Sequence, residues 1–492
     1  MLRKLKYIDL FSGCGGLSLG LEAAGFELEL AVEKSDMAAE TFYHNFIERI
    51  PSKEFWAEYT SHETSIEAQA KSKLIVNELQ KLLDSPNIIE NLKSKEIDLI
   101  AGGPPCQGFS LAGRRNPDDL RNQLPWQFIE LVERIQPKMV LIENVSGIRQ
   151  NFKKHAIKSP FDQLKQALEE TRPGYVVQSL LVNAMHFGAP QHRPRVMLVG
   201  LRSDIATDQG ITPSEFWRSE FDHPNHLNTR SRPRLAPEAT HFDENILTVK
   251  DAIWDLNDEG YSVQLSDKSY RRKNGQYAKH MRQNLKWMNG TIRRVNRKSD
   301  LKNHVLRKHA DHIITRFRLY QYLQGEGLSP KLLNLPARNE GSFSDKILEL
   351  SQHLENCTIP AIAPDSTILA QSIKELASLV VELKTKKHSQ RPLKWDKPSP
   401  TVVSLPEDFV HPSRPRTMTV REMARFQSFP DTFEFRSKET TGSLRRRFEV
   451  PQYTQVGNAV PPILAEAVGK HMQAILRSYY RASEKYEFLE AV

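Results

Sequence analysis

The first part of the chain alternates between apolar runs of two different periodicities, and this alternation limits it to a small number of folds. Residues 6–11 (KYIDLF) suit a buried strand, and the glycine-rich turn 12–16 (SGCGG) follows directly. Residues 17–26 (LSLGLEAAGF) then have helical spacing, and residues 27–33 (ELELAVE) again favour a strand. A strand–turn–helix–strand unit is the building block of a parallel sheet that is covered by helices on both faces.

The same alternation continues to about residue 200 and predicts one doubly wound, mainly parallel sheet over residues 1–200. Residues 50–83 are polar, helical in spacing and without a motif, so we interpret them as an outer connection. From 201 to 390 the strand signal weakens and Pro- and His-rich stretches appear, which predicts a second, mixed domain. Compact blocks return over 391–492. The later strand candidates are 97–103, 139–145, 175–184 and 195–201.

Length, cysteine content and charge limit the classes of protein to which this chain can belong. The 492 residues exceed one ordinary core, and three scattered cysteines fit neither a disulfide framework nor a zinc-ligand spacing. No apolar run is long enough to cross a membrane, so we expect a soluble, cytoplasmic protein. Residues 270–318 hold 15 Lys and Arg against two acids, while the whole chain has a net charge of +9. This basic segment is either a solvated face or a polyanion-binding module, and its interleaved aromatic and amide residues favour nucleic acid.

One thiol lies in an unusually constrained stretch, AGGPPCQGFS at residues 101–110. Pro104 and Pro105 fix the backbone before Cys106, and Gly108 frees it afterwards. A lone cysteine is usually buried and inert, but a thiolate held on a rigid loop at the end of a strand can act as a nucleophile. We therefore interpret Cys106 as a candidate nucleophile.

Charged residues also lie at the ends of other strand candidates. Glu33 ends the second strand, where a carboxylate can accept hydrogen bonds from a ribose diol, although an exposed strand-end acid explains it as well. Glu143 follows the apolar run MVLI, where parallel sheets bind ligands, and Asn144 beside it also suits a helix N-cap. Arg193 and Arg195 are two residues apart before a strand, so both side chains can share one face, as ordinary surface charge also would.

Taken in order, these stretches resemble the motifs of the cytosine-5 DNA methyltransferase family. The blocks are DLFSGCGG, GPPCQGFS, ENV, QHRPR, REMARFQSFPD and QVGNAVPP, and they span residues 1–200 and 391–470. The resemblance implies an α/β fold: a Rossmann-like, S-adenosylmethionine-dependent methyltransferase sheet built from residues 1–200 and 391–492. It also implies an inserted mixed target recognition domain at 201–390, and the basic segment 270–318 falls within that insertion.

The resemblance further implies a set of residues that bind S-adenosylmethionine. Glu33 would hold the ribose hydroxyls, and Lys34 stands where the family often places a bulky apolar residue against the adenine. An acid near the adenine amino group is expected ahead of IDLIAGGPPC, and Asp84 has about the right spacing. Residues near 458 would return to pack beside residue 11. The implied cofactor-binding residues are Phe11, Gly13, Gly15, Gly16, Glu33, Asp84, Pro105, Asn458 and Val460.

The implied reaction is methyl transfer to carbon 5 of a cytosine in duplex DNA. Cys106 would add to carbon 6, Glu143 would act at ring nitrogen 3, and Arg195 would contact the ring oxygen, with Arg193 supporting the loop. Because no side chain reaches that carbon inside a stacked duplex, the target base must be flipped out. The expected DNA contacts are Ser110, Arg114, Arg115, Arg293, Arg294, Arg297 and Lys298.

Two other functions stay open at this point. A tRNA cytosine-5 methyltransferase shares the catalytic unit, but that branch has a small recognition region and a Cys-Phe-Thr tripeptide. Here about 190 residues separate the two halves, and the tripeptide is absent. A catalytically inactive DNA-binding relative usually lacks the cysteine, the glutamate or the glycine loop, all of which are present in this chain.

The remaining expectations concern metal and partners. His304, His309 and His312 do not share one helical face, so we expect phosphate contact or solvation there and no metal site. The catalytic block begins at residue 7, a compact layout that favours a prokaryotic, monomeric enzyme of a restriction-modification or other defence system. Its partners would be double-stranded DNA and a cognate restriction endonuclease or another defence protein.

Overall fold

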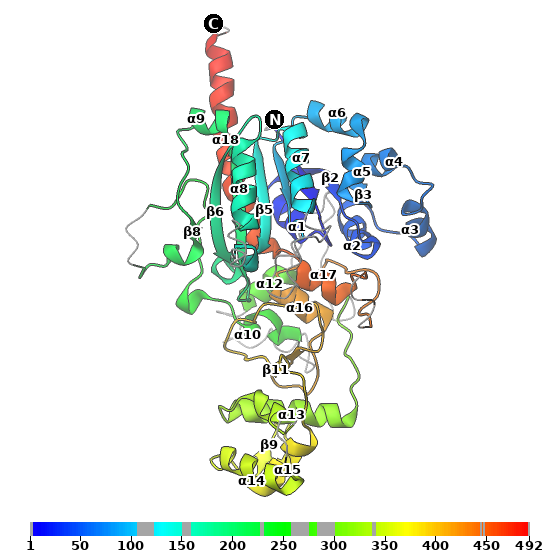
Figure 1. The fold of residues 1–492 in the computed structure, drawn as a ribbon, viewed down its shortest axis with the longest axis vertical. Coiled ribbons are helices and arrows are strands. Elements are labelled where there is room, and N and C mark those ends of the chain that lie inside the picture. Colours follow the sequence, from blue (N-terminus) through cyan, green and yellow to red (C-terminus); the bar gives the residue numbers. More distant parts are fainter. Residues whose placement is uncertain are drawn as a thin grey trace.

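The computed structural model describes residues 3–105, 123–149, 159–226, 231–256, 275–282, 301–336, 341–442, 445 and 448–490. Within these residues a large α/β body carries a smaller helical unit at one end (Figure 1). The first and last parts of the chain both belong to the body, because α18 (Pro462–Glu490) packs on α1 (Gly16–Ala23). None of the helices in these ranges combines the length and the apolar character that a membrane crossing requires.

An eight-stranded sheet forms the centre of the body, in the order β3-β2-β1-β4-β5-β7-β6-β8. Strands β3, β2, β1, β4 and β5 pair in parallel, whereas β7 is antiparallel to both β5 and β6. This order confirms the predicted, mainly parallel sheet, and it brings the start of β7 to the edge where the parallel strands end. The strands are β1 (Leu5–Leu10), β2 (Phe26–Val32), β3 (Leu74–Ile75), β4 (Leu99–Gly102), β5 (Met139–Val145), β6 (Tyr175–Asn183), β7 (Pro194–Arg202) and β8 (Trp217–Arg218).

The side chains of each strand alternate between two apolar layers, because successive residues of a strand point to opposite faces. In β5, Met139 and Leu141 join the layer that contains α1 and α18, whereas Val140 and Ile142 join the layer on the other face. A strand that is buried on both faces reads as an unbroken apolar run, which is why MVLI shows no alternation. The helices of the second layer are α5 (Leu79–Leu83), α6 (Pro86–Ser94), α7 (Leu124–Ile135) and α8 (Pro160–Glu170).

The connection from β2 to β4 contains a strand that the sequence analysis missed. The helical interpretation of residues 50–83 is correct for most of this stretch, but β3 lies within it and pairs with the end of β2. Because β3 has only two residues, Leu74 and Ile75, it is too short for a periodic signal. The helical elements before it are α2 (Asp36–Phe42), the π-helical turn η1 (Tyr43–Ile47), α3 (Lys53–Tyr59) and α4 (Ile66–Lys71).

The C-terminal part of the body approaches the N-terminal part at backbone distance. A Cβ atom on Gly16 would lie 2.4 Å from the carbonyl oxygen of Val460, and one on Gly20 would lie 2.4 Å from the Cβ atom of Ala465. Gly469 of α18 meets α1 in the same way, so small residues on both helices let their backbones pack closely. The other C-terminal helices of the body are α16 (Val420–Phe426) and α17 (Gln452–Asn458).

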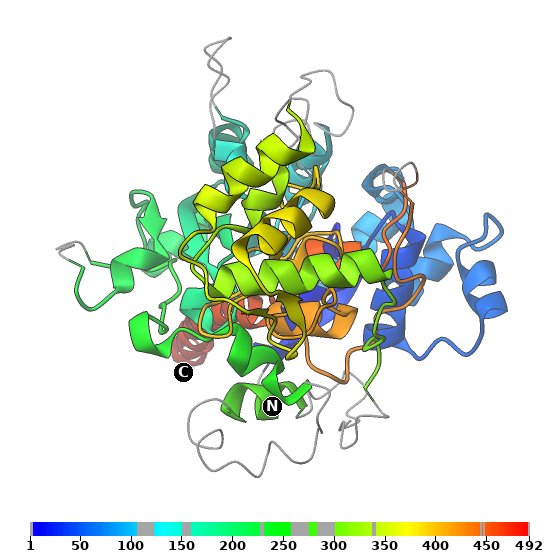
Figure 2. The same ribbon diagram turned by 90° about the horizontal axis from the view of Figure 1, so that it is seen from below.

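The helical unit has a core of its own, separate from the two layers on the sheet. Leu323 of α13 and Val380 of α15 are fully buried in it. Figure 2, seen from below, shows its helices stacked over one end of the body. Residues 368–387 have helical spacing, but only residues 373–382 form the helix α15, because residues 368–370 form the strand β10. The elements of the unit are α13 (Asp311–Gly325), α14 (Phe343–His353), α15 (Ile373–Glu382) and the hairpin of β9 (Ala361–Ile362) with β10 (Ile368–Ala370).

The predicted insertion 201–390 is therefore not one separate unit. Its first part adds β8 to the main sheet, and α10 (Val249–Ile253) packs against both α16 and α12 (Gly275–Arg282). The reason is that Leu235, Val249 and Ile253 are buried in the body's own apolar layer. A separate core begins only with α13. The remaining elements named below are α9 (Ser203–Asp208), β11 (Arg391–Pro392) and β12 (Phe409–Val410).

Replacing Gly20 with alanine should weaken the packing of α18 on α1. The new methyl group would meet Ala465 at 2.4 Å, and overpacking of this kind costs about 1–3 kcal/mol. Gly325→Ala is the matched control, because a Cβ atom at Gly325 has no neighbour within 4 Å. Urea unfolding should show a lower midpoint for Gly20→Ala and an unchanged or higher one for Gly325→Ala. Equal midpoints would contradict the close approach of the two helices.

Candidate functional site

Three of the charged residues that the sequence singled out, Glu33, Glu143 and Arg195, lie along one edge of the sheet. Parallel strands bind ligands outside their carboxyl ends, and the start of the antiparallel β7 lies at the same edge. Figure 1 shows α16 and α17 beyond this edge, between the sheet and the helical unit. In the order of the strands, the edge presents Asn77, Glu33, Phe11, Pro105, Glu143 and Arg195.

The turn after β1 has a backbone that few sequences can adopt. Phe11, Gly13 and Gly15 have φ angles of 58°, 55° and 96°, in the left-handed region that disfavours side chains. A Cβ atom on Gly15 would lie 2.3 Å from the ring of Phe46, so only glycine fits there. On Gly13 the added atom would have no neighbour within 4 Å, which means that the turn faces open space at this residue. The turn then leads into the first residue of α1.

Glu33 closes this turn from the neighbouring strand. Its Oε2 accepts the backbone N–H of Gly13 at 2.8 Å, and its Oε1 accepts that of Ser35 at 2.7 Å. Burial raises the pKa of the carboxyl group, while the backbone donors act in the opposite direction. Each carboxylate oxygen has capacity for a second donor. The structure thus brings the strand-end acid onto the glycine turn, where a diol could bind beside Gly13.

Buried polar atoms lie behind the turn. Asp9 accepts the hydroxyl of Ser18 at 2.6 Å through Oδ2, and burial raises the pKa of Asp9 to about 7. Among the described residues, Asp9 Oδ1 and Ser12 Oγ have no hydrogen-bond partner. Buried polar atoms are nearly always paired in native proteins. Two buried polar atoms without a partner, at a turn that faces open space, therefore fit a bound ligand that carries polar groups.

The structure does not place Asp84 at this edge. Residues 86–94 form α6 rather than a strand, and Asp84 is an exposed residue at the end of α5. Gln127, near the start of α7, contacts Gln80, whereas Arg134, near its end, contacts the carbonyl of Leu83. Since α7 runs from the carboxyl edge toward the opposite edge, α5 carries Asp84 away from the site.

Asn77, which the sequence patterns did not single out, lies at this edge. It follows β3 by two residues, and β3 pairs with the end of β2 that precedes Glu33. The backbone N–H of Glu33 donates to the carbonyl of Ile75 at 3.0 Å, which fixes the two strand ends side by side. The half-buried Asn77 side chain therefore lies at the same edge as Glu33. The short apolar pair LI before Asn77 was the only feature of the sequence that indicated a strand end at this residue.

The predicted return of residues near 458 to the first turn is present. Val460 is buried, and its carbonyl oxygen lies against Gly16, as described above. The thiol of Cys14 lies 3.6 Å from the carbonyl oxygen of Gln455 in α17. Asn458, the last residue of α17, is exposed. This return closes one side of the open space at Gly13 with residues from the far end of the chain.

The other half of the edge carries a buried ion pair. Arg195 Nε lies 2.8 Å from Glu143 Oε1, and the two side chains are only 9% and 11% exposed. A Cβ atom on Gly103 would lie 3.1 Å from Glu143 Oε2, so the carboxylate rests against the backbone that follows β4. Asn144 Nδ2 also donates to the carbonyl of Pro104 at 2.9 Å. These contacts hold the segment that leads to residue 106 against the end of β5.

Eight of the predicted residues lie outside the described ranges, so the structure does not place them. They are Cys106, Ser110, Arg114, Arg115, Arg293, Arg294, Arg297 and Lys298. Pro105 is the last described residue before the candidate nucleophile. Of the three histidines, His304 bonds to the hydroxyl of Thr419 and His309 to Thr417, each at about hydrogen-bond distance.

Arg193 has other hydrogen-bond partners than Arg195, whose guanidinium lies against Glu143. It is fully buried, and its guanidinium donates to the carbonyls of Val402, Gly457 and Ala459 at 2.8–3.2 Å. Burial lowers its pKa well below the ordinary arginine value, and Arg195 adds to this effect. Arg193 thus ties the start of β7 to the end of α17 and the segment after it.

Comparisons with known proteins identify a matching family and several relatives. The chain matches the model of a family described as C-5 cytosine-specific DNA methylase over residues 5–474. It is 30% identical to the type II methyltransferase M.AgeI of Thalassovita gelatinovora, over 96% of this chain and 100% of that protein. It is 28% identical to the type II methyltransferase M.DdeI of Desulfomicrobium norvegicum, over 95% and 88%. A solved prophage-encoded protein of E. coli, titled a DNA modification methyltransferase, aligns with a TM-score of 0.49 at 23% identity, over 96% and 99%.

Asp9 should make the stability of the protein depend on pH in a defined direction. The folded protein keeps the proton up to about pH 7, whereas the unfolded chain loses it near the ordinary aspartate pKa of 3.8. The folded state thus binds the extra proton in that window, so the free energy of unfolding falls as the pH rises from about 4 to 7. The melting temperature of the wild-type protein should therefore fall over this pH range. It should fall less in Asp9→Asn, while the exposed-site control Asp84→Asn should show the same fall as the wild type. An unchanged pH profile in Asp9→Asn would contradict the assignment.

Proposed function

The chain belongs to the C-5 cytosine-specific DNA methylase family, and we propose that it methylates cytosine in duplex DNA through a transient bond between Cys106 and the base. The observation that carries this mechanism is the ion pair of Glu143 and Arg195, which rests against the backbone leading from β4 to Cys106. An acid, an arginine and a nucleophile from three neighbouring strand ends supply the groups that the chemistry of a pyrimidine ring requires. The sheet brings these strand ends together at one edge.

The chemical problem is that carbon 5 of cytosine is a weak nucleophile within an aromatic ring. The Cys106 thiolate would attack carbon 6 and form a carbon–sulfur bond, which moves an electron pair toward ring nitrogen 3 and makes carbon 5 nucleophilic. Glu143 would hold a proton at nitrogen 3 and so stabilise the charge that develops there. After carbon 5 has received the methyl group, loss of its proton returns the electron pair that expels the thiolate. The half of the edge around Gly103 and Glu143 is the place for the ring.

Arg195 would serve two partners in this scheme. Its Nε already holds one oxygen of Glu143, which orients the other oxygen toward the backbone at Gly103. A guanidinium presents five donors in a fixed plane, so Arg195 can hold Glu143 and contact the ring oxygen of cytosine together. Arg193 would support this arrangement through its hydrogen bonds to the backbone carbonyls of Val402, Gly457 and Ala459. We therefore assign Arg193 a positioning role.

The other half of the edge would hold the methyl donor of this family, S-adenosylmethionine, which supplies an electrophilic methyl group when it is bound. The fit rests on the open space at Gly13, the orphaned oxygens of Asp9 and Ser12, and the acceptor capacity of Glu33. Glu33 would bind the ribose hydroxyls. The further residues proposed to surround the donor are Phe11, Gly15, Gly16, Asn77, Pro105, Asn458 and Val460.

The names of the relatives suggest the biological role that we propose for this protein. Those compared above are named type II methyltransferases, which favours a role as the modification enzyme of a restriction-modification system. We propose double-stranded DNA as the substrate and a cognate restriction endonuclease as the functional partner. The insertion between α9 and α16, whose separate core starts with α13, would supply sequence recognition.

We expect substitutions of Asn77 and Asp84 to differ in their effect on the affinity for the methyl donor. Asn77→Ala removes a polar side chain at the edge beside Glu33, so the affinity for S-adenosylhomocysteine should fall roughly tenfold. Asp84→Ala changes an exposed residue at the remote end of α5 and should leave the affinity unchanged. Isothermal titration calorimetry measures both. A loss in Asp84→Ala with none in Asn77→Ala would contradict the placement of the adenine end of the pocket beside β3.

Cys106→Ser should abolish methylation, with a loss of at least roughly a thousandfold in turnover, while DNA binding is retained. Bisulfite sequencing of DNA from a host that expresses the wild-type protein should show 5-methylcytosine within one short sequence, and none in a host with Cys106→Ser. Cys357→Ser, which changes a half-buried thiol of the helical unit, is the control and should methylate normally.

A duplex with 5-fluorocytosine at the methylated position tests the covalent bond itself. Carbon 5 then carries no removable proton, so the bond between Cys106 and carbon 6 should persist through denaturing electrophoresis. The wild-type and Cys357→Ser proteins should be trapped, and Cys106→Ser should not. Clean separation of wild-type protein from this duplex, in the presence of methyl donor, would contradict the mechanism.

A further inference from the structure

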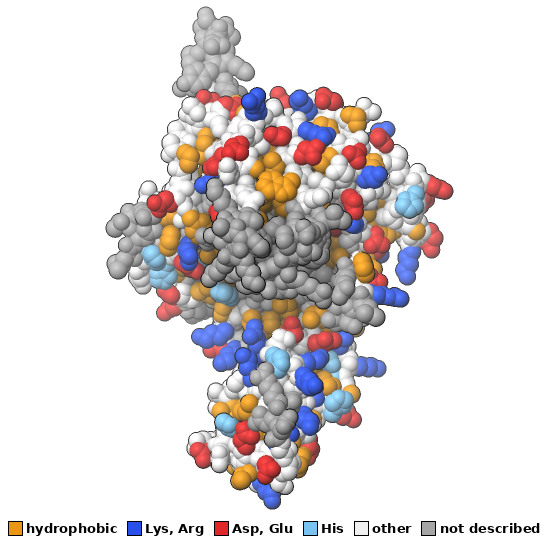
Figure 3. All heavy atoms as spheres, viewed as in Figure 1, with side chains coloured by type: hydrophobic (Ala, Val, Ile, Leu, Met, Phe, Trp, Pro, Cys, Tyr) orange, Lys and Arg blue, Asp and Glu red, His pale blue; other side chains and the backbone are white. Residues whose placement is uncertain are grey.

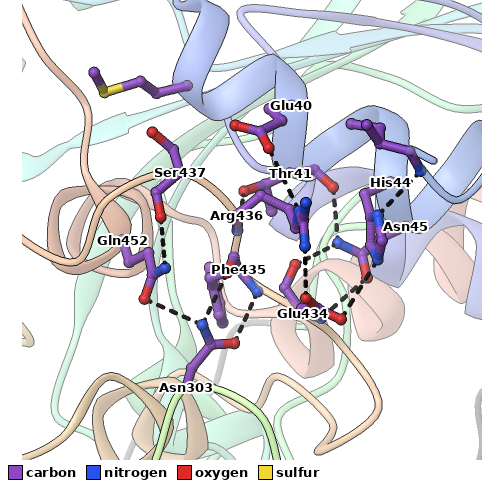
Figure 4. Close-up of polar contacts among 12 residues, drawn as sticks. Glu40, Thr41, His44, Asn45, Asn303, Glu434, Phe435, Arg436, Ser437 and Gln452 are labelled. Carbon is purple, nitrogen blue, oxygen red and sulfur yellow. Dashed lines mark hydrogen bonds and ion pairs between the residues drawn. The ribbon is translucent and has the colours of Figure 1, made fainter. Parts of the chain in front are cut away.

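The hydroxyl group of Thr41, in α2, bonds to residues from the far end of the chain. Thr41 is fully buried, and its hydroxyl donates to Oε1 of Gln455 in α17 at 2.7 Å. The same hydroxyl accepts the backbone N–H of Arg436 at 2.8 Å (Figure 4). These partners are 414 and 395 positions away in the sequence. We call the three residues the Thr41 junction.

Gln455 completes the junction from α17. Its side chain is buried, and its Nε2 donates to the carbonyl of Met37 in α2 at 3.1 Å and to that of Val450 at 3.0 Å. Its backbone carbonyl lies against the thiol of Cys14 in the glycine turn. One residue of α17 thus contacts both α2 and the turn after β1.

Further contacts join α2 and the turn η1 to the backbone around Arg436. Nδ2 of Asn45, in η1, donates to the carbonyl of Glu434 at 2.8 Å, and Oδ1 of Asn45 accepts the N–H of Glu434 at 3.1 Å. The guanidinium of Arg436 lies 3.4 Å from the carboxylate of Glu40 in α2 and 2.9 Å from that of Glu434. Figure 4 shows these side chains of α2 and η1 facing the same short segment.

The buried hydroxyl differs in its energetic effect from the charges on the surface. Figure 3 shows acidic and basic side chains interspersed over the described part of the body, and exposed ion pairs contribute only about 0–1 kcal/mol each. Water cannot replace the hydroxyl of Thr41, because this residue is fully buried. Its loss would leave the N–H of Arg436 and Oε1 of Gln455 unpaired, at a cost of about 1–3 kcal/mol for each group.

The two helices that Thr41 joins form two sides of the compartment beside Glu33. Helix α2 begins three residues after Glu33, and the backbone N–H of its N-cap, Ser35, donates to Oε1 of Glu33 at 2.7 Å. Helix α17 leads to Val460, which closes the compartment from the far end of the chain. The spacing between Glu33 and Val460 therefore depends on how α2 and α17 are held together.

We propose that Thr41 is a positioning residue for the methyl donor, because its hydroxyl sets the spacing of α2 and α17 and so places Glu33 opposite Val460. The inference rests on the proposed function, since it takes S-adenosylmethionine as the ligand of this compartment. Thr41 acts through these two residues, which line the compartment. A displacement of about 1 Å in a group that binds a ligand is enough to weaken its hydrogen bonds.

Two substitutions of Thr41 separate its hydroxyl from its shape. Thr41→Val keeps the branched side chain and removes the hydroxyl, so the affinity for S-adenosylhomocysteine should fall roughly tenfold. Thr41→Ser keeps the hydroxyl and should bind like the wild type. Isothermal titration calorimetry measures both. In methylation assays Thr41→Val should raise the KM for S-adenosylmethionine and leave kcat at saturating donor unchanged, because the ground state and the transition state lose the same binding energy.

Thr171→Val is the matched control for a purely structural effect. Thr171 is also buried, and its hydroxyl donates to the carbonyls of Leu168 at 2.9 Å and Pro173 at 3.2 Å. It lies between α8 and β6, at the edge of the sheet opposite the site. Thr171→Val should lower the melting temperature as Thr41→Val does and leave the affinity for S-adenosylhomocysteine unchanged. Wild-type affinity in Thr41→Val, or an equal loss in Thr171→Val, would overturn the proposal.

Arg436→Met tests the same contact in case Thr41→Val does not fold. It removes the ion pairs of Arg436 with Glu40 and Glu434, at a half-buried position, and keeps the backbone N–H that bonds to Thr41. Weaker docking of α2 should lower the affinity for S-adenosylhomocysteine roughly threefold. An affinity equal to that of the wild type in this variant would then contradict the positioning role.

The same measurements separate this proposal from the proposed function. If Thr41→Val loses affinity for S-adenosylhomocysteine and the wild-type protein transfers no methyl group to duplex DNA, the positioning role is supported and the proposed function is contradicted. If the wild-type protein methylates DNA and Thr41→Val keeps the wild-type affinity and KM, only the positioning role is contradicted. Failure of the wild-type protein to bind S-adenosylhomocysteine at all would overturn both.

Discussion

The antiparallel pairing of β7 with β5 is the contact on which the arrangement of the site depends. In this register Val145, at the end of β5, lies opposite Arg195, at the start of β7. The guanidinium can therefore reach back to Glu143, two residues earlier on β5. A parallel β7 would begin at the other edge of the sheet, roughly 27 Å away for a strand of nine residues. The antiparallel direction of β7 thus brings Arg195 to an edge that is otherwise formed by the carboxyl ends of the parallel strands.

The parallel part of the sheet divides the same edge into two compartments. Strands β3, β2 and β1 contribute Asn77, Glu33 and the glycine turn, and strands β4 and β5 contribute Gly103 and Glu143. The boundary between the neighbouring strands β1 and β4 lies between them, because the chain proceeds from β1 to β2 and β3 on one side and then returns to β4 on the other side. The two compartments are therefore neighbours, as a transfer between two bound molecules requires. The return of Val460 to Gly16 then closes the first compartment from the far end of the chain.

Buried charges fasten the insertion to the body. Burial alone would lower the pKa of Arg425, but Asp255 and Asp431 outweigh it and raise that pKa well above its ordinary value. Asp255 comes from the insertion, whereas Arg425 and Asp431 belong to the C-terminal part of the body. Removal of one partner from such a group leaves an uncompensated charge, at a cost of about 3–5 kcal/mol. The position of the insertion on the body thus depends on buried ion pairs between them.

The sequence by itself determined the parallel sheet, the glycine turn after β1 and the strand-end positions of Glu33 and Glu143. These follow from local rules, namely the alternation of strand and helix periods and the backbone angles that glycine permits. The tertiary structure alone decided that Asn77 and not Asp84 lies beside Glu33, because β3 has two residues and α5 runs away from the edge. It also decided that Arg193 and Arg195, two residues apart, have different partners. Contacts between residues that are 47 to 266 positions apart settle such choices, and no local pattern contains them.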